Sequence, residues 1–189
     1  MTPFPSHDTE SAPEGSKALL EGSLKAFGRY PGLHKVLAES PQAFEAYQIL
    51  HRLFTETEFD ADELTVVWQS INVENECHYC VPAHTGIAKM MKVSDEISNA
   101  LRDETPLPTE KLEALRTFTV KMVRERGLVS EETLDAFFAA GYGHRAVLDV
   151  ILGMAQKTIS NYVNHVAETP VDEVFKPLAW TRSETPLEV

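Results

Sequence analysis

Signals that begin α-helices recur along this chain, and they constrain its fold more than any other feature. Each combines a side chain that caps a helix N-terminus with a proline or acidic residue suited to the first turn. Such signals begin at Ser40, Asp60, Ser94, Thr109 and Ser130. Apolar residues follow at roughly helical intervals, and no convincing strand or hairpin pattern lies between them. The sequence therefore predicts an all-α fold.

The spacing of starts and stops predicts eight helices. Seven of them cover roughly residues 19–27, 41–55, 80–91, 95–101, 109–126, 130–141 and 143–168, and one begins at residue 60 and includes residues 66, 67 and 71. The length of 189 residues suits one domain. We expect that domain over residues 17–176, after a flexible N-terminal segment at 1–16 and before a peripheral tail at 177–189.

Charge and hydropathy exclude several classes of partner. The formal net charge of −12 argues against nucleic acid, since binding a phosphate backbone requires a basic face. The first 17 residues contain no apolar signal-peptide core, and no apolar run is long enough to span a bilayer. These features predict a cytoplasmic protein without a membrane partner, in a compartment that keeps thiols reduced.

The only two cysteines stand three residues apart, and a histidine follows the second by four residues. Pro82 fits only the first turn of a helix, so the helix begins near residue 79 or 80. Cys80 and His84 then share one helix face, and Cys77 lies at the helix N-terminus within reach of Cys80. Helix N-termini and nearby bases favour a thiolate in such motifs, whereas the negative charges of Glu74 and Glu76 oppose it, so the direction of the thiol pKa shift stays open.

Four interpretations of this motif differ in what they require. A structural disulfide across so short a loop removes little chain entropy. A zinc site has three ligands in Cys77, Cys80 and His84 but no second cysteine pair to close it. Covalent haem attachment requires histidine where Val81 stands. A redox-active dithiol with a local base needs only the residues present, so this interpretation is favoured.

The stretch 73–84, preceded by an apolar helix, resembles the core motif of the carboxymuconolactone decarboxylase and AhpD-like alkylhydroperoxidase superfamily. The spacing Cys-x-x-Cys-x-x-x-His is typical of its peroxidase branch. The resemblance covers about residues 60–168 and includes the run 161–170. It implies an AhpD-like helical bundle, assembled as a homo-oligomer (trimer or hexamer), that acts as a thiol peroxidase without metal, flavin or haem.

The resemblance also implies a role for each residue of the motif. Cys80 attacks a hydroperoxide, His84 helps to deprotonate it, and Cys77 resolves the product as a disulfide, which an external dithiol protein or small thiol then reduces. Reasoning from helix termini alone favours Cys77 as the nucleophile, because the outermost thiol is usually more accessible. The two assignments of the nucleophile remain open at this point.

Two positions depart from the family pattern. Tyr79 stands where a histidine precedes the second cysteine, and Thr65 stands where a relay glutamate precedes Cys77 by twelve residues. Glu63 is the nearest carboxylate, and it has two possible roles. One is a proton relay, and the other is a capping box in which Glu63 reaches back to Asp60.

The expected helix at 143–168 is apolar on most sides in its first half, which indicates a central or interface helix. Near its end a polar stripe contains Asn161, Asn164, His165 and Glu168. The stripe is either a solvated face or, for Asn161 or His165, part of the substrate pocket. With Tyr79, these two residues complete the candidate pocket.

The predicted function is therefore an antioxidant thiol peroxidase that reduces alkyl hydroperoxides or hydrogen peroxide. Three alternatives stay open: a disulfide oxidoreductase, a cofactor-free lactone decarboxylase and a non-enzymatic, zinc-stabilised interaction module. Comparing oxidation by peroxide and by disulfides tests the first, activity without both cysteines tests the second, and bound metal tests the third.

Overall fold

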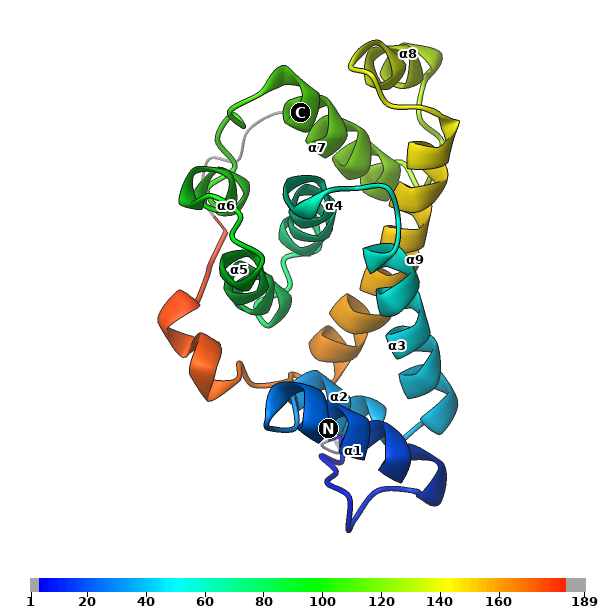
Figure 1. Ribbon diagram of the computed structural model, residues 1–189, viewed down its shortest axis with the longest axis vertical. Coiled ribbons are helices and arrows are strands. Elements are labelled where there is room, and N and C mark those ends of the chain that lie inside the picture. Colours follow the sequence, from blue (N-terminus) through cyan, green and yellow to red (C-terminus); the bar gives the residue numbers. More distant parts are fainter. Residues whose placement is uncertain (1–3, 183–189) are drawn as a thin grey trace.

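The computed structural model describes residues 4–182, and every regular element in that range is a helix (Figure 1). The all-α prediction is confirmed. The helices are α1 (Glu14–Phe27), α2 (Gly32–Leu37), α3 (Pro41–Thr55), α4 (Ala61–Glu74), α5 (Cys80–Met90), α6 (Asp95–Arg102), α7 (Glu110–Arg124), α8 (Glu131–Ala139), α9 (His144–Val166) and the 3₁₀-helix η1 (Glu173–Leu178).

The predicted capping residues set the helix starts. Five side chains each accept a hydrogen bond from the backbone N–H three residues on: Ser40, Asp60, Ser94, Thr109 and Ser130. The prediction missed α2 and η1, which are six residues each and begin after residues whose side chains make no cap bond. It also began α1 five residues late, because that helix too begins without a side-chain cap.

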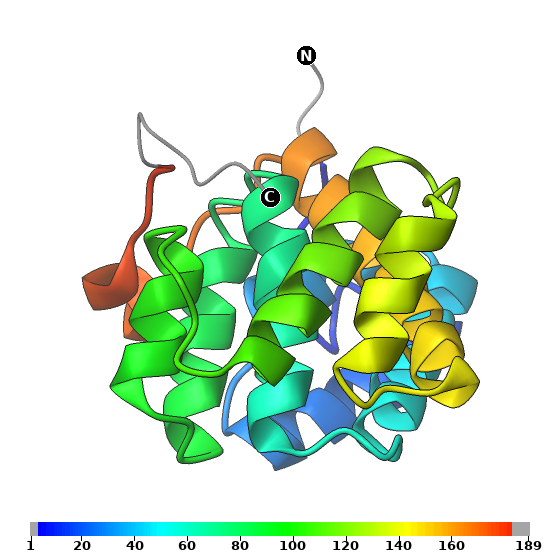
Figure 2. The same ribbon diagram turned by 90° about the horizontal axis from the view of Figure 1, so that it is seen from above.

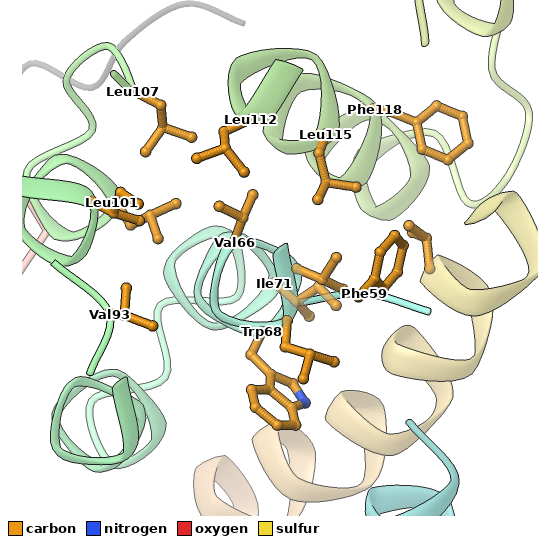
Figure 3. Packing of buried hydrophobic residues seen from close by; sticks show 14 of the residues in the cluster. Phe59, Val66, Trp68, Ile71, Val93, Leu101, Leu107, Leu112, Leu115 and Phe118 are labelled. Carbon is orange, nitrogen blue, oxygen red and sulfur yellow. The ribbon is translucent and has the colours of Figure 1, made fainter. Parts of the chain in front are cut away.

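Helix α4 is the centre of the fold. Every residue from Glu63 to Val73 is buried, so the helix is covered on all sides. Helices α5, α6, α7 and α9 surround it, and α4, α5 and α6 run side by side, end-on in Figure 1 and lengthwise in Figure 2. Figure 3 shows Val66 pointing toward α7 and Trp68 pointing to the opposite side.

Two apolar clusters divide the interior. The larger one joins α4 to α6, α7 and α9 and contains Val66, Leu115 and Phe118 (Figure 3). The smaller one joins α1, α2 and α3 to the segment that holds both cysteines. The thiols therefore lie in a closed interior between the N-terminal helices and the central helix.

The described part of the predicted tail packs on its own chain. The Trp180 indole donates to the Arg102 carbonyl over 2.8 Å, and Arg182 pairs with Glu104 at 2.8 Å. The predicted flexible segment at 1–16 overlaps α1, which begins at Glu14. The predicted limits of the domain remain predictions, and residues 1–3 and 183–189 lie outside the described residues. Within residues 4–182, no helix combines the length and the apolar character needed to cross a bilayer.

Close packing of α9 gives a stability prediction. A Cβ atom on Gly153 would lie 2.8 Å from Phe54 Cε2 and 3.0 Å from Val67 Cγ1. Overpacking of this kind costs about 1–3 kcal/mol, so we expect Gly153→Leu to lower the free energy of unfolding by about 2 kcal/mol in urea denaturation. Gly22→Leu is the matched control, since nothing lies within 4 Å of a Cβ there. Equal stability of the two variants would contradict this packing.

Candidate functional site

A tight helix ending places the two cysteines. Glu76 adopts a left-handed conformation with φ of 51°, after which the chain turns back from α4. The Glu76 N–H donates to the Val73 carbonyl and the Cys77 N–H to the Asn72 carbonyl, both over 2.9 Å. This is the Schellman pattern, which satisfies the last carbonyls of α4. It brings Cys77 under the first turn of α5, which begins at Cys80 as predicted.

Both thiols are free and buried, with exposures of 0% for Cys77 and 2% for Cys80. The Cys80 backbone N–H donates to Cys77 Sγ over 3.3 Å. The side-chain amide of Asn164 donates to Cys80 Sγ, also over 3.3 Å. Cys80 lines the cavity described below, whereas Cys77 lies behind it and is not among the lining residues. A ligand in that cavity meets Cys80 first.

The pKa values of the two thiols move in opposite directions. Burial raises the pKa of Cys80, but the Cys77 hydrogen bond and the charge of Lys157, with help from the amides of Asn164 and Asn161, lower it to about 6. The pKa of Cys77 is raised by its hydrogen bond to Cys80 and by burial. Near neutral pH Cys80 is therefore a thiolate that Cys77 stabilises as a donor.

His84 lies one turn after Cys80 on α5 and is 5% exposed. Its Nε2 lies 3.0 Å from Nζ of Lys157, and its ring centroid lies 4.9 Å from that of Trp68. Burial, and then the charge of Lys157, hold the pKa of His84 well below 6.5. The imidazole is therefore neutral at physiological pH.

The cavity in front of Cys80 has a volume of about 370 Å³, large enough for an organic molecule of moderate size. One part of its wall carries aromatic and imidazole rings, another part is aliphatic, and Arg29, Lys157 and Asp172 add charged groups. The rings include His34, Tyr47, His51 and Trp68, and the aliphatic part includes Leu33, Ala83, Ile87, Met90 and Met91. Burial is the main cause that lowers the pKa values of His34 and His51 to about 4. Both of these imidazoles are therefore neutral near pH 7.

A ladder of side-chain amides joins three helices beneath the motif. Asn161 on α9 donates to Asn72 on α4 over 3.0 Å and accepts from Asn75 over 2.8 Å. Gln69 on α4 donates over 3.1 Å to both Thr85 Oγ1 and the Val81 carbonyl on α5. These bonds fix α5 against α4 and α9, so Cys80 stays in one position relative to the cavity.

Tyr79, a candidate pocket residue from the sequence, has a buried ring among the residues that line this cavity. Its hydroxyl donates to the Asp172 carboxylate over 2.9 Å and accepts from the Leu33 N–H over 3.2 Å. Asp172 also pairs with Arg29 at 2.6 Å. Burial and Asp172 raise the pKa of Tyr79, so the phenol stays protonated. The Tyr79 side chain therefore forms part of the cavity wall, and its hydroxyl is held by the hydrogen bond to Asp172.

Three other predicted site residues take different places. Glu63 forms the predicted capping box with Asp60, and its carboxylate also binds Tyr142 at 3.1 Å and Lys111 at 2.8 Å. Glu63 is not among the residues that line the cavity, and nor is His165, which is exposed. Asn161 is buried in the amide ladder. Glu63 and His165 therefore lie outside the lining of the cavity that Cys80 faces.

Sequence reasoning missed two features of the site, Lys157 and the thiol contact of Asn164. Both residues lie on the polar stripe of α9, which runs through Lys157, Ser160, Asn161 and Asn164, all buried. The signal was present in the sequence, because these residues recur at intervals of three and four in an apolar helix. The sequence-based prediction placed this polar stripe one turn too close to the C-terminus, and for that reason it included His165.

The zinc alternative has no ligand set in the structure. Within the part of the chain that the structure describes, no three histidine, cysteine or carboxylate side chains converge as metal ligands. Nε2 of His84 faces Lys157, a cation, which disfavours a second positive charge there.

Comparison with solved structures shows that this chain has an AhpD-like helical fold. A peroxidase-related protein from Ralstonia eutropha JMP134, described as an alkylhydroperoxidase AhpD core, superposes with a TM-score of 0.80 at 18% identity, covering 91% of this chain and 93% of that one. A peroxidase-related protein from Silicibacter sp. TM1040 gives 0.76 at 16% identity, covering 93% and 96%.

The debrominase Bmp8 has the same fold. A variant of Bmp8 in which one cysteine is replaced by alanine, solved with 2,3,4-tribromopyrrole, superposes with a TM-score of 0.76 at 14% identity, covering 94% of this chain and 95% of that one. No protein-family model and no curated protein matches the sequence. The neighbours therefore establish the architecture, and the reaction has to be argued from the site.

Proposed function

We propose that this protein is a thiol peroxidase that reduces organic hydroperoxides with Cys80 and Cys77. The observation that carries the proposal is the arrangement of the two thiols. Cys80, with a pKa lowered to about 6, lines a cavity of about 370 Å³, and its backbone N–H donates to Sγ of Cys77, which is not among the lining residues. This is the order that a nucleophilic thiolate and its resolving thiol require.

In the proposed reaction, Cys80 Sγ attacks the distal oxygen of ROOH. The S–O bond forms as the O–O bond breaks, the leaving RO⁻ takes one proton to give ROH, and Cys80 becomes a sulfenic acid. Cys77 then condenses with the sulfenic acid, releasing water and forming a disulfide. An external dithiol returns the pair to two thiols and is itself oxidised to a disulfide. We assign proton transfer in the first step to His84, which lines the same cavity.

The cavity wall supports an organic peroxide in preference to hydrogen peroxide. Leu33, Ile87 and Met91 offer apolar contact that hydrogen peroxide cannot use. Arg29, a partly exposed cation among the lining residues, is already paired with Asp172. We therefore propose a substrate with an uncharged, apolar body.

Intact mass measurement tests the proposed reaction. Reduced protein is treated with substoichiometric cumene hydroperoxide. For each equivalent of peroxide, we expect one disulfide to form, so that the protein mass falls by about two hydrogens and two free thiols disappear. A parallel arm replaces the peroxide with glutathione disulfide, which tests the disulfide-oxidoreductase alternative. Thiol loss that is faster with the disulfide, or peroxide consumption no faster than that of free cysteine, would refute the peroxidase.

The lowered pKa of Cys80 gives a pH prediction. The thiolate fraction rises as pH increases through about 6, so the rate constant for peroxide consumption should climb between pH 5 and 7 and level off above pH 7. An unperturbed thiol would instead gain reactivity up to about pH 9. Stopped-flow measurement of a single turnover across pH 5–9 distinguishes the two profiles.

A second candidate reaction is reductive debromination of an aromatic substrate. The likeness to the debrominase Bmp8 and the ring-bearing cavity wall favour it. Cys80 would attack bromine of a protonated ring, giving the ring C–H and a sulfenyl bromide, and Cys77 would displace bromide to form the disulfide. Bromide release from 2,3,4-tribromopyrrole by reduced protein, with one disulfide per bromide, would support this reaction over peroxide reduction.

We also propose a homo-oligomer, a trimer or hexamer by analogy, in a reducing compartment such as the cytoplasm. The exposed side of α9 carries large apolar side chains at helical intervals, which suits burial against another copy. They are Leu148, Ile151, Tyr162 and Val166. Light scattering coupled to size exclusion measures the assembly directly.

A further inference from the structure

Lys157 is a fully buried cation at the centre of the site. It is 1% exposed in the middle of α9, and it lines the cavity together with Cys80 and His84. Burial lowers its pKa, while the negative charge of Cys80 acts in the opposite direction. Burying an ammonium group is costly unless a charge or a strong acceptor compensates it. The groups available for this are the thiols and His84.

When Lys157 carries its proton, its contact with His84 determines the imidazole tautomer. An ammonium group has three N–H donors and no acceptor, so His84 Nε2, 3.0 Å away, must accept the hydrogen bond. A neutral imidazole that accepts at Nε2 carries its proton on Nδ1. Among the described residues, Nδ1 of His84 has no hydrogen-bond partner although the atom is buried. The site therefore holds an unused N–H donor on a ring that lines the cavity.

We infer that Lys157 is a positioning residue of the site: its ammonium stabilises the Cys80 thiolate and holds His84 as the Nδ1–H tautomer, ready to protonate the leaving oxygen. This inference deepens the proposed peroxidase function and rests on it for the reaction step. It reverses the predicted role of His84, which becomes the proton donor to the product instead of the base for Cys80.

The proton and charge balance of the first step follows. Cys80 carries one negative charge and Lys157 one positive charge before the reaction. As Sγ bonds to the distal oxygen, RO⁻ leaves and takes the Nδ1 proton of His84, and His84 takes a proton from Lys157 at Nε2. The products are the neutral sulfenic acid, ROH, neutral His84 and neutral Lys157. No buried charge is left unpaired after the step, which favours it in a closed site.

The tautomer is measurable in the unsubstituted protein. In ¹⁵N NMR of reduced protein labelled at histidine, we expect one ring, assigned to His84 by its loss in His84→Gln, with a protonated Nδ1 and an unprotonated Nε2 at pH 7. This measurement involves no change to Lys157 and no peroxide. A protonated Nε2 on that ring would overturn the inference.

Substitution tests the effect of Lys157 on the thiol. We expect Lys157→Met to raise the pH midpoint of the first alkylation by iodoacetamide by at least about one pH unit, and to slow alkylation at pH 6 at least about fivefold. Alkylation of the variant should recover at pH 9. A purely structural defect would not be rescued by pH. Lys157→Arg retains the charge and should stay within about half a unit of wild type.

Arg145→Met is the matched control, because it removes a cation of the same helix that is exposed and paired with Glu58 at 2.7 Å. We expect its alkylation midpoint to equal that of the wild type. A Lys157→Met variant that is folded by circular dichroism and keeps the wild-type midpoint would refute the inference. Neither the NMR measurement nor the alkylation assay uses a peroxide. If the wild-type protein did not react with peroxide, the proposed peroxidase function would be refuted. The two assays would still test the role of Lys157 independently.

Discussion

Replacing Cys80 by serine is expected to abolish peroxide reduction, with a loss of at least about 10³-fold in the rate constant. Serine keeps the shape of the side chain, but its hydroxyl does not ionise near neutral pH. Cys77→Ser should instead retain the first step and stop there, since no resolving thiol remains. A single addition of hydroperoxide should then leave a sulfenic acid, seen as a gain of about 16 Da and trapped by dimedone.

The two variants are matched controls for each other, because both thiols are buried and both changes are cysteine to serine. Comparing the two variants shows which thiol attacks the peroxide and which one resolves the sulfenic acid. If Cys77 were the nucleophile, as reasoning from helix termini suggests, the sulfenic acid would accumulate in Cys80→Ser and peroxide consumption would persist there. Peroxide consumption at the wild-type rate in Cys80→Ser would refute the assignment of Cys80.

Much of the fold was predictable because its signals are local. Capping residues such as Ser40, Asp60 and Ser130 act within one turn, so the sequence alone locates the helices they begin. The helices that were missed, α2 and η1, are short and lack a side-chain cap. Their positions depend on packing against other parts of the chain, which no local pattern encodes.

The site was predictable only in part, because its chemistry depends on contacts between distant segments. The spacing of Cys77, Cys80 and His84 indicated a dithiol with a neighbouring imidazole. The charge that tunes it comes from Lys157, 77 positions after Cys80 in the sequence (157 − 80). Likewise, the burial of both thiols depends on α1, α2 and α3, which pack over the motif. Tertiary packing decides both properties.

Acid should destabilise the protein through the buried imidazoles of the cavity. The pKa values of His34 and His51 are about 4 in the folded protein, mainly because of burial, against 6.5 for the free side chain. Between these limits the unfolded chain binds protons that the folded protein does not, so the free energy of unfolding falls as pH falls from 6.5 toward 4. Each histidine should contribute a loss of about 2 kcal/mol between pH 7 and 4.5.

His51→Phe isolates one of these contributions. The ring of His51 stacks on Trp68 with centroids 5.5 Å apart, and its Nδ1 has no partner among the described residues, so phenylalanine preserves the packing and removes the titration. The free energy of unfolding is measured by urea denaturation at pH 7 and at pH 4.5. We expect its decrease between these two pH values to be about 2 kcal/mol smaller in His51→Phe than in the wild type. His165→Gln, at an exposed position, should leave the fall unchanged. An identical fall in His51→Phe and wild type would mean that His51 accepts a proton in the folded state, and the cavity wall would then be charged in mild acid.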